Sequence, residues 1–348
     1  MDMDSPRISI IVLNWNGWSD TIECLESLYQ IAYPNYDVIV VDNGSTDDSV
    51  QNLELYAEGR IEVKSRFIKY NVNNKPISVT QHQANETDGI EFEIEGISAS
   101  CSDRRLVLLR NEKNLGYAEG SNVGIRFALR VFNSDYVLLL NNDAVVAPDF
   151  LAQMISVAEA HPEAGIFSPK IYFYDQPERI QLTWNRVELV RGSIFLAGAG
   201  EIDQGQFDEI AETDFSPGVC FLIRRATIDG LGLFDSEFFC YSEESDYCFR
   251  ARKAGIRSIY VPMARIWHKV SQSANKIDGF ALYYLTRNRF WFTKRHASPR
   301  QYSSFILYFF TVELWKSFLT LIAKRNSVYA LKSYLRGVLD GMKTGSKR

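Results

Sequence analysis

The sequence predicts an α/β protein built on an open, mostly parallel β-sheet flanked by helices. Apolar runs of strand length recur before residue 142. Between them lie segments that are predicted to form helices or glycine-containing loops. Strands that alternate with helices in this way are typical of parallel sheets. Polar residues follow the runs directly, as expected where ligands bind beyond the carboxyl ends of the strands.

The first two predicted elements are a strand and a helix. The segment "ISIIVLN" is a continuous apolar run, which is expected for a strand buried in a parallel sheet. The following "SDTIECLESLYQ" places Ile22, Leu25 and Leu28 on one face of a helix. Either Ser19 or Asp20 can cap the start of that helix.

Three further apolar runs continue the alternation. They lie in "YDVIVVDNGSTDDSV", in "LVLLRN" before the helix entry "NLGYAEGSNVGIRFAL", and in "DYVLLLNND". Asn14, Asp42, Asn114 and the segment 141–143 all fall at the predicted carboxyl edge of the sheet. Their coincidence at one edge predicts a binding site there.

Residues 57–105 break this alternation. Apolar and polar residues alternate around "NNKP" and "ETDG", which predicts short antiparallel strands joined by turns. We therefore expect a β-rich insertion at 57–105 within a main domain that spans residues 1–296.

A cluster of acids follows the next apolar run. In "YSEESDYCFRARKAG", Glu243, Glu244 and Asp246 stand at the start of a helix that Gly255 ends. Interaction with the helix dipole accounts for one or two acids but not for three. Because crowded carboxylates raise one another's proton affinity, the cluster suits a general base.

Residues 297–348 are predicted to form a basic, amphipathic helical region. From 280 to 348 there are thirteen Lys or Arg and two acids, a net charge of +11. A helix over 305–323 would carry a narrow polar stripe, made of Glu313, Lys316, Ser317 and Thr320. Such a helix lies in a membrane surface, packs on a partner such as a second copy, or is buried against the main domain.

Composition excludes several classes of protein. The 348 residues carry a net charge of -5, so the chain before this basic region is acidic, which argues against general nucleic-acid binding. Five cysteines without a CxxC spacing disfavour a zinc site or disulfide framework and favour a reducing compartment. The acidic start "MDMDSP" is not that of a signal peptide, so we expect a cytoplasmic protein. Walker, GxSxG and GxGxxG motifs are absent from the sequence.

Two of the polar strand ends have two interpretations each. The "DNGS" at 42–45 can contact a nucleotide base and ribose, or it forms an ordinary turn. The "NND" at 141–143 can likewise be a turn, or a site for Mg²⁺ or Mn²⁺ that a diphosphate completes. His268, which follows a later apolar run, is either a further metal ligand or a structural residue.

Taken together, the motifs resemble those of a known family. In chain order they are "ISIIVLNWNG", "VIVVDNGSTDDS", "NEKNLGYAEGSNVGI", "YVLLLNNDAVVAPDFL", "GVCFLIRRATIDGLGLFDSEFFCYSEESDYCFRARKAG" and "YYLTRNRFWF". This series resembles the family 2 glycosyltransferases of the GT-A fold, a Rossmann-like fold, and in particular their rhamnosyltransferase-like branch. The resemblance covers residues 7–56 and 105–296.

The resemblance implies an activity and a set of site residues. It implies inverting transfer of a sugar from a nucleotide-diphosphate donor, dTDP-rhamnose or a UDP-sugar, to a hydroxyl of a glycan or lipid-linked acceptor. The metal, Mg²⁺ or Mn²⁺, would be bound by Asp143, Asn141 and His268. The donor would be bound by Asn14, Asp42, Asn43, Ser45, Asn114, Gly116 and Asn142. The catalytic acids would be Glu244, Asp246 and Glu243.

Two positions depart from the family pattern. Asn141 stands where the DxD-type motif has its first acid, so metal binding should be weaker and depend on the diphosphate. Glu244 stands where relatives often have Asp as the base, which changes its reach, and Asp246 is the second candidate. These departures leave open a catalytically silent nucleotide-sugar-binding protein that recruits a membrane or a partner. A nucleotidyltransferase would need a basic phosphate loop, which "NWNGWSDT" does not offer.

Overall fold

The structure is a computed structural model that describes residues 5–84, 105–270, 279–323 and 328–343. Its strands are β1 (Ile8–Asn14), β2 (Tyr36–Asp42), β3 (Ser78–Gln83), β4 (Arg105–Arg110), β5 (Tyr136–Asn141), β6 (Ala144–Val146), β7 (Ala164–Phe173), β8 (Ile180–Leu182), β9 (Asn185–Glu188), β10 (Ser193–Leu196), β11 (Ala211–Glu212), β12 (Cys220–Arg224) and β13 (Arg257–His268). Its α-helices are α1 (Trp18–Leu28), α2 (Ser49–Ala57), α3 (Gly116–Phe127), α4 (Phe150–Ala160), α5 (Arg225–Leu231), α6 (Glu243–Lys253), α7 (Phe280–His296), α8 (Pro299–Tyr308), α9 (Leu314–Ala323) and α10 (Val328–Met342).

The main sheet follows the strand order β11-β13-β7-β12-β5-β1-β2-β4-β3. β5, β1, β2, β4 and β3 are parallel neighbours, which confirms the predicted strand–helix alternation in the N-terminal half. β12 lies between β5 and β7 and is antiparallel to both. Because β12 runs backwards, the loop before it returns to the carboxyl end of β5, where Asn141 N–H donates to Val219 O at 2.9 Å.

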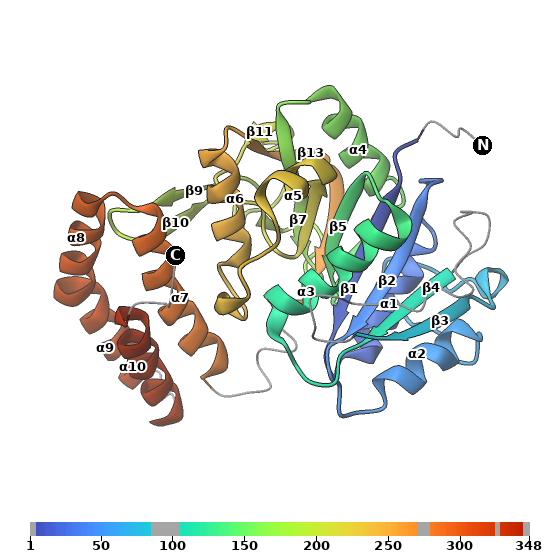
Figure 1. Ribbon diagram of the computed structural model, residues 1–348, viewed down its shortest axis with the longest axis horizontal. Helices are drawn as coiled ribbons and strands as arrows, with labels where there is room; N and C mark the ends of the chain where they lie inside the picture. Colours follow the sequence, from blue (N-terminus) through green and yellow to red (C-terminus); the bar gives the residue numbers. More distant parts are fainter. Residues whose placement is uncertain (1–4, 85–104, 271–278, 324–327, 344–348) are drawn as a thin grey trace.

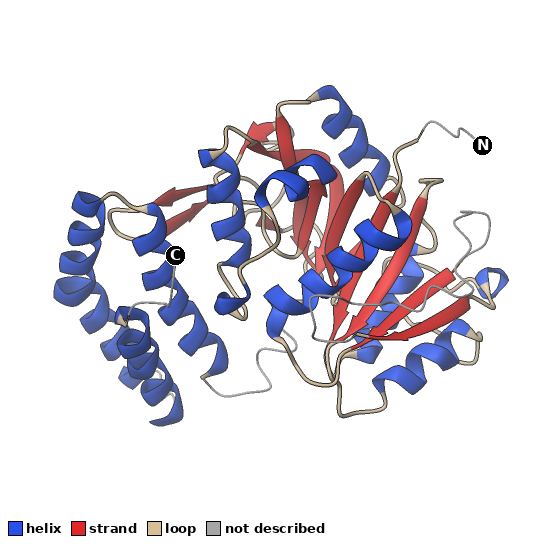
Figure 2. Cartoon of the chain, viewed as in Figure 1, coloured by secondary structure: helices blue, strands red, loops and turns tan. Residues whose placement is uncertain are grey.

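Helices cover both faces of this sheet (Figure 2). Ile8, Ile10 and Val12 of β1 share one buried cluster with α1, α2 and α4. Ile11, on the opposite face of the same strand, belongs to a second cluster with α3, α5 and α6. This alternation explains the continuous apolar runs, because each central strand is buried on both faces.

The start of α1 differs from the prediction. Gly17, rather than Ser19 or Asp20, is the N-cap, and it makes no side-chain cap. The Gly17 carbonyl accepts from the N–H groups of Asp20 and Thr21, so the helix begins earlier than expected. Asp20 instead forms an ion pair with Lys269 at 2.7 Å. That contact ties α1 to the end of β13.

The predicted antiparallel insertion at 57–105 is wrong for its described part. Its described strand, β3, pairs in parallel with β4 and extends the main sheet at one edge (Figure 1). The segment before β3 is held to α1 by an ion pair between Lys75 Nζ and Glu26 Oε2 at 2.9 Å. An edge strand is half exposed and shows the same alternation as an antiparallel strand, so the pattern could not distinguish them. The second expected strand region, with "ETDG", lies within 85–104, outside the described residues.

The C-terminal helices form a separate cluster at one end of the molecule (Figure 1). Phe290 of α7, Phe305 and Phe309 of the α8 region, and Tyr334 and Val338 of α10 share one apolar cluster. A π-helical segment, η5 (Phe309–Glu313), joins α8 to α9. Among the described residues, one helical stretch, 299–321, is sufficiently long and apolar to cross a membrane. Of its most apolar part, 11% is buried.

The placement of the polar stripe of 305–323 was left open by the sequence, and the structure divides the stripe between an inward-facing and an exposed part. Glu313 pairs with Arg289 of α7 at 3.5 Å, so this part of the polar stripe faces inward. Leu307, Trp315 and Leu319 are 66%, 59% and 64% exposed. The helix is therefore not buried against the main domain. It carries apolar side chains on its exposed face as well as on its packed face. Periodicity indicates stripes but not which stripe faces the neighbouring helix.

Two glycines bring α10 close to the backbone of α7. A Cβ added at Gly337 would lie 2.7 Å from the Tyr283 carbonyl oxygen, and one at Gly341 would lie 3.0 Å from that of Arg287. Neither position has room for a larger side chain without a shift of one helix. The two helices are therefore in direct backbone contact.

Candidate active site

A cavity of about 460 Å³ lies at the carboxyl ends of β1 and β5. Loops before β12 and before α6 close it on one side, and Ile194 and Leu196 of β10 contribute to its wall. Its carboxylate, amide and imidazole lining is Asn43, Asn114, Asn141, Asn142, Asp143, Glu243, Glu244 and His268. With Gly116, which also lines it, the cavity brings together nine of the predicted site residues from five separate segments.

Asp143 and His268 meet on one wall of this cavity. β6 and β13 pair antiparallel with Ala144 opposite His268, which places the imidazole beside the residue that precedes β6. His268 Nε2 lies 3.1 Å from Asp143 Oδ1, and both side chains are buried. His268 Nδ1 lies 2.9 Å from Gln181 Oε1, an oxygen that can only accept, so Nδ1 carries the proton.

This arrangement fits a divalent cation. A neutral imidazole protonated on Nδ1 would present the Nε2 lone pair towards the Asp143 carboxylate, whereas an imidazolium would form an ion pair with it. Two electron-pair donors that face each other are favourable when a cation lies between them. Gln181 would orient the imidazole in the way typical of histidines that bind metals.

The two asparagines before Asp143 have different surroundings. Asn142 Nδ2 donates to Thr21 Oγ1 at 3.0 Å and to Gly17 O at 3.3 Å, which fixes the turn to the start of α1. Asn141 lines the cavity beside Asp143. No group of three or more His, Cys, Asp or Glu side chains suitable for a metal occurs in the described part of the chain. Asp143 and His268 are thus short of a complete coordination shell.

A loop between β4 and α3 is held by Asn43. Its Oδ1 accepts from Asn111 Nδ2 at 2.9 Å and from Leu115 N–H at 3.1 Å. Its Nδ2 donates to Asn114 Oδ1 and to Gly116 O at 3.1 and 3.0 Å. All four of these hydrogen bonds are internal, so Asn43 shapes the cavity wall through its neighbours.

Gly116 brings this loop against the segment before α6. Its φ is +82°, and an added Cβ would lie 2.4 Å from the carbonyl oxygen of Phe239. A side chain would therefore be strained by its backbone angle and would collide with backbone. The N–H of Ala118 then donates to the same oxygen at 3.1 Å.

Asn14, Asp42 and Ser45 form a network next to the cavity without lining it. Asn14 Nδ2 donates to Asp42 Oδ1 at 2.9 Å and to Ser45 Oγ at 3.2 Å. Asn14 Oδ1 accepts from Thr21 Oγ1 at 2.8 Å. The Asp42 and Asn14 side chains are buried, so they link the ends of β1 and β2.

Glu243 and Glu244 project from the first turn of α6 into the cavity. Burial raises the pKa of both carboxyls, and the negative charge of Glu244 raises the pKa of Glu243 further. A hydrogen bond between the two opposes the rise at Glu244. We interpret this as one shared proton that resides on Glu243, with Glu244 as the carboxylate.

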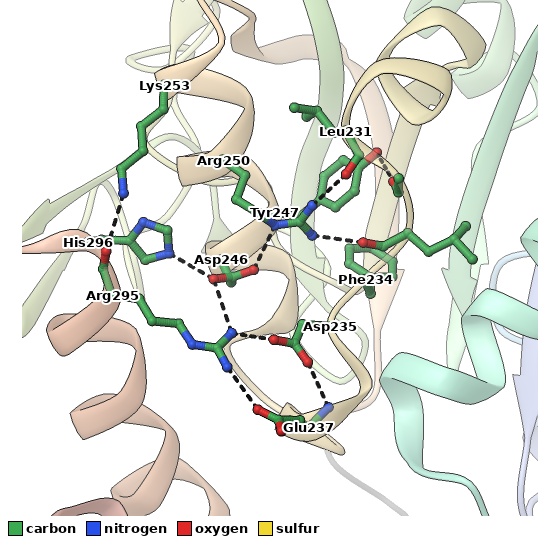
Figure 3. Close-up of polar contacts among 12 residues, drawn as sticks. Leu231, Phe234, Asp235, Glu237, Asp246, Tyr247, Arg250, Lys253, Arg295 and His296 are labelled. Carbon is green, nitrogen blue, oxygen red and sulfur yellow. Dashed lines mark hydrogen bonds and ion pairs between the residues drawn. The ribbon is translucent and has the colours of Figure 1, made fainter. Parts of the chain in front are cut away.

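Asp246, the second candidate base, does not line the cavity. Residues two apart on a helix lie on different faces, so Asp246 points away from the face that carries Glu244. Its oxygens instead meet His296 Nε2 at 2.8 Å and Arg250 Nε at 2.9 Å (Figure 3). Burial raises the pKa of Asp246, but these two partners outweigh it and the pKa is lowered. A carboxyl held in ion pairs is a poor proton acceptor, so the prediction for Asp246 is not supported.

Two residues near the site were missed in the sequence. Tyr117 donates to Gly218 O at 2.6 Å, and burial together with Glu243 and Glu244 raises its pKa. Gln181, the partner of His268, lies on the short strand β8. The aromatic residue after "NLG" was a visible signal for Tyr117. Nothing in the pattern around Gln181 distinguished it from a surface residue.

Sequence comparison identifies the family. The model of the family described as "Glycosyltransferase like family 2" matches residues 71–291, which is more than half of the chain. The model of "Glycosyl transferase family 2" matches residues 9–76. The chain belongs to glycosyltransferase family 2.

This family 2 member is similar to several curated rhamnosyltransferases and to other curated relatives. It is 27% identical to the N-acetylglucosaminyl-diphospho-decaprenol L-rhamnosyltransferase of Mycobacterium tuberculosis, over 58% of this chain and 69% of that protein. It is 26% identical to the low-salt glycan biosynthesis hexosyltransferase Agl10 of Haloferax volcanii, over 55% of this chain and 61% of that protein. It is also 26% identical to the uncharacterized protein y4gI of Sinorhizobium fredii, where the match spans 79% of this chain but only 26% of the relative.

Solved structures confirm the GT-A fold. The mannosyltransferase PcManGT of Pyrobaculum calidifontis, in complex with GDP-Man and Mn²⁺, has a TM-score of 0.55 at 18% identity and covers 99% of this chain and 77% of its own. S. aureus TarS 1–349 in complex with UDP-GlcNAc has a TM-score of 0.53 at 16% identity over 96% and 80% of the two chains. The likeness supports the fold that the sequence predicted.

Proposed function

We propose that this family 2 member is an inverting glycosyltransferase that uses a nucleotide-diphosphate sugar, dTDP-rhamnose or a UDP-sugar. The acceptor is a hydroxyl of a glycan or a lipid-linked saccharide. The supporting observation is that the carboxyl pair Glu243–Glu244 and the pair Asp143–His268 line one cavity. A base and a cation site in one cavity are what transfer of a sugar from a diphosphate requires.

In this proposal Glu244 is the general base. Its carboxylate accepts the proton of the acceptor hydroxyl while that oxygen attacks the anomeric carbon from the face opposite the diphosphate. Glu243 keeps its own proton and donates it to Glu244 in a hydrogen bond, which orients the base. Transfer in a single displacement inverts the anomeric carbon, so no carboxylate nucleophile is needed, unlike in retaining glycosidases.

Asp143 and His268 would hold Mn²⁺ or Mg²⁺, with Asn141 beside them. The bound cation would neutralise charge on the departing diphosphate. Gln181 keeps the imidazole in the tautomer that leaves Nε2 free for this role. The structures of PcManGT with GDP-Man and Mn²⁺ and of another structural neighbour, GalNAc-T7, with UDP, GalNAc and Mn²⁺ support the choice of cation.

The nucleotide would lie between the β2 end and the β4–α3 loop. Asp42, linked to Asn14 and Ser45, would contact the base, and Asn43, Asn114, Gly116 and Asn142 would shape the adjacent wall. Asp42 is buried in the described structure, so base recognition would require a small opening of this network. The role of Asp42 stays a prediction.

The C-terminal helices would bring the enzyme to its acceptor. The helices α8, α9 and α10 carry exposed apolar side chains and also exposed Lys316, Lys332 and Arg336. Apolar and basic groups together suit the anionic surface of a membrane, where lipid-linked acceptors reside. We propose peripheral attachment to the cytoplasmic face, and a homodimer through the same helices is the competing arrangement.

A panel assay tests the proposed activity. The purified protein is incubated with dTDP-rhamnose and a set of UDP- and GDP-sugars in the presence of Mn²⁺, and release of nucleoside diphosphate is measured. We expect one donor to be hydrolysed or transferred and the Glu244→Gln variant to lose at least about 100-fold in rate. Donor binding by calorimetry without turnover across a broad acceptor panel would instead support a silent binding protein. Absence of both binding and turnover would refute the proposal.

A further inference from the structure

The segment that delivers Glu243 and Glu244 into the cavity has an unusual backbone. Phe239, Tyr241 and Ser242 all have positive φ, of 64°, 66° and 72°, although none is glycine. Phe239 also has a ψ of -62°, and the N–H of Cys240 donates to the Phe238 carbonyl at 2.8 Å. This is a γ-turn of the rare, positive-φ kind. Such a segment persists only where its surroundings hold it in place.

Asn288 of α7 holds this turn from the side. Its Nδ2 lies 3.0 Å from the carbonyl oxygen of Phe238, 2.8 Å from that of Cys240 and 2.7 Å from that of Tyr241. Carbonyl oxygens can only accept, so the amide nitrogen must face them. Asn288 is completely buried, and its Oδ1 accepts from Arg287 Nε at 2.8 Å. One side chain therefore binds three backbone carbonyls of a four-residue strained turn.

Arg287 adds a second attachment to the same turn. Its Nη2 donates to the carbonyl oxygens of Glu237 and Phe238 at 3.0 and 2.7 Å. Its guanidinium lies over the ring of Trp291 at 4.1 Å and over that of Tyr284 at 4.8 Å. The ring of Tyr284 is stacked on Phe239 itself, with 5.0 Å between centroids. These contacts place the entire turn against the first half of α7.

The far end of α7 holds the first turn of α6. His296 Nε2 contacts Asp246 Oδ1 at 2.8 Å, and both side chains are 3% exposed (Figure 3). Arg295 Nη2 contacts Glu237 at 3.1 Å, and its Nη1 contacts Asp235, which lies just before the turn. Residues 288, 292 and 296 recur at a spacing of four, so they share one face of the helix. Phe292, between the other two, packs edge-on against Phe249 of α6.

We propose that Asn288, assisted by His296, is a positioning residue for the carboxyl pair Glu243–Glu244. In this proposal one face of α7 holds in place the turn and the helix that carry the pair. The catalytic role of the pair rests on the proposed function. The contacts between α7 and the turn do not depend on that function. Without the three hydrogen bonds of Asn288, the positive-φ residues would relax towards ordinary backbone angles. Glu243 and Glu244, which follow the turn directly, would then lose their fixed orientation.

The first readout needs no substrate. Amide hydrogen exchange of residues 239–246 is compared in the wild type, Asn288→Ala and Thr293→Val. Thr293 is equally buried on α7, but its hydroxyl bonds only within the helix, to Arg289 O at 2.7 Å, so Thr293→Val is the matched control. We expect exchange in this segment to be about ten-fold faster or more in Asn288→Ala and unchanged in the control.

The second readout is titration of the carboxyl pair by ¹³C NMR of glutamate-labelled protein. A loosened turn admits water, so the raised titration of the pair should move down towards the ordinary range in Asn288→Ala but not in Thr293→Val. Tyr117 of α3, Cys240 and Tyr241 of the turn, and Cys248 of α6 are titratable groups whose charge would interact with the pair. Burial raises the pKa of each of these, so they stay neutral while the pair titrates.

The outcomes separate this inference from the proposed function. If Asn288→Ala does not fold, Asn288→Ser is used, because a hydroxyl can still donate to one of the carbonyls. Unchanged exchange and unchanged titration in a folded variant would overturn the positioning role whatever the panel assay shows. Where the panel yields a donor, kcat should fall about 100-fold with KM for the donor nearly constant, as expected for a displaced base. If the panel assay shows no donor binding or turnover but exchange and titration change in Asn288→Ala, the proposed activity is refuted and the positioning role of Asn288 is retained.

Discussion

At the scale of single residues, the site contains two pairs of buried ionisable side chains. Asp143 and His268 Nε2 form a pair of electron donors that a cation would satisfy, whereas Glu243 and Glu244 reduce their charge by retaining a proton. The shared proton lowers the negative charge of the cavity before an anionic donor binds, and a cation held by Asp143 and His268 would lower it further. Substitutions at these positions should therefore change ligand binding and pH dependence more than folding.

The cation site gives the first prediction. Asp143→Ala should abolish Mn²⁺-dependent turnover and weaken Mn²⁺ binding in the presence of nucleoside diphosphate by at least about ten-fold, because the described cavity offers few other ligands. Asn141→Asp should preserve turnover and tighten Mn²⁺ binding, since it supplies a second carboxylate. Both effects are measured by calorimetric titration and by the panel assay. Full activity of Asp143→Ala would show that the 141–143 segment is an ordinary turn.

The carboxyl pair gives a prediction on pH. The proposed transfer requires Glu244 to be unprotonated, and the pKa of Glu244 is raised above 4.5, the ordinary value for glutamate. The rate should therefore fall as pH decreases through this raised pKa, so that the acidic limb of kcat/KM lies above the usual carboxyl range. A pH–rate profile measures this limb. An acidic limb at 4.5 or below would contradict the assignment of Glu244.

The same raised pKa values also predict how stability depends on pH: stability should fall as pH rises, whereas the rate should rise. A group whose pKa is raised in the folded state contributes stability that is complete below its unfolded pKa and is lost as pH rises through the folded pKa. Glu243→Gln mimics the protonated acid, so it should melt at a higher temperature than the wild type at pH 8, with the difference shrinking at pH 4. Thermal unfolding followed by circular dichroism at both pH values tests this. A lower melting temperature than wild type at pH 8 would argue against a buried, proton-sharing pair.

At the scale of secondary-structure elements, the sequence predicted what burial determines and missed what neighbours determine. β1, β2, β4 and β5 were predictable because strands buried on both faces require continuous apolar runs. The parallel pairing of β3 was not, because an edge strand carries the same alternation in either direction. For the candidate site, strand ends located Asp143 and its neighbours. The inward orientation of Asp246 towards α7 depended on His296, a residue 50 positions away, which no local pattern contains.

The loop that carries Gly116 gives a prediction at this scale. Gly116→Ala should destabilise the protein by about 2–4 kcal/mol, because a side chain at positive φ is strained and this one also meets the Phe239 backbone. Gly230→Ala is the matched control, since Gly230 lies in α5 with nothing within 4 Å of an added Cβ. The control should be neutral or stabilising by up to about 1 kcal/mol. Urea unfolding of both variants measures the difference, and equal effects would mean that the close contact at Gly116 is absent.

At the scale of the whole molecule, the acidic α/β domain and the basic helical cluster present different surfaces. The cluster exposes Trp315 and Leu319, while its internal face is satisfied by contacts such as Glu313–Arg289. Aromatic and aliphatic groups beside lysines and arginines are a combination that binds anionic lipid. The two surfaces divide the proposed tasks between chemistry at one end and attachment at the other.

Attachment gives the last prediction. The full chain should cosediment with vesicles that contain phosphatidylglycerol at low salt and be released at about 0.5 M salt, where the Debye length shrinks to a few ångströms. The double variant Trp315→Glu/Leu319→Glu should lose binding, while Met263→Glu, which changes an equally exposed apolar residue on β13, should retain it. Sedimentation without lipid would reveal a dimer instead. Absence of vesicle binding together with loss of a dimer in the double variant would favour the partner arrangement.

The glycines of α10 have a consequence for how the enzyme meets its acceptor. Gly337 and Gly341 let α10 pack closely against α7, and α7 carries both Phe280 at the cavity wall and Asn288 at the turn. A surface that holds α10 would therefore also fix the height and direction of the cavity mouth above it. The acceptor hydroxyl would then be selected partly by its distance from that surface, in addition to its fit in the pocket.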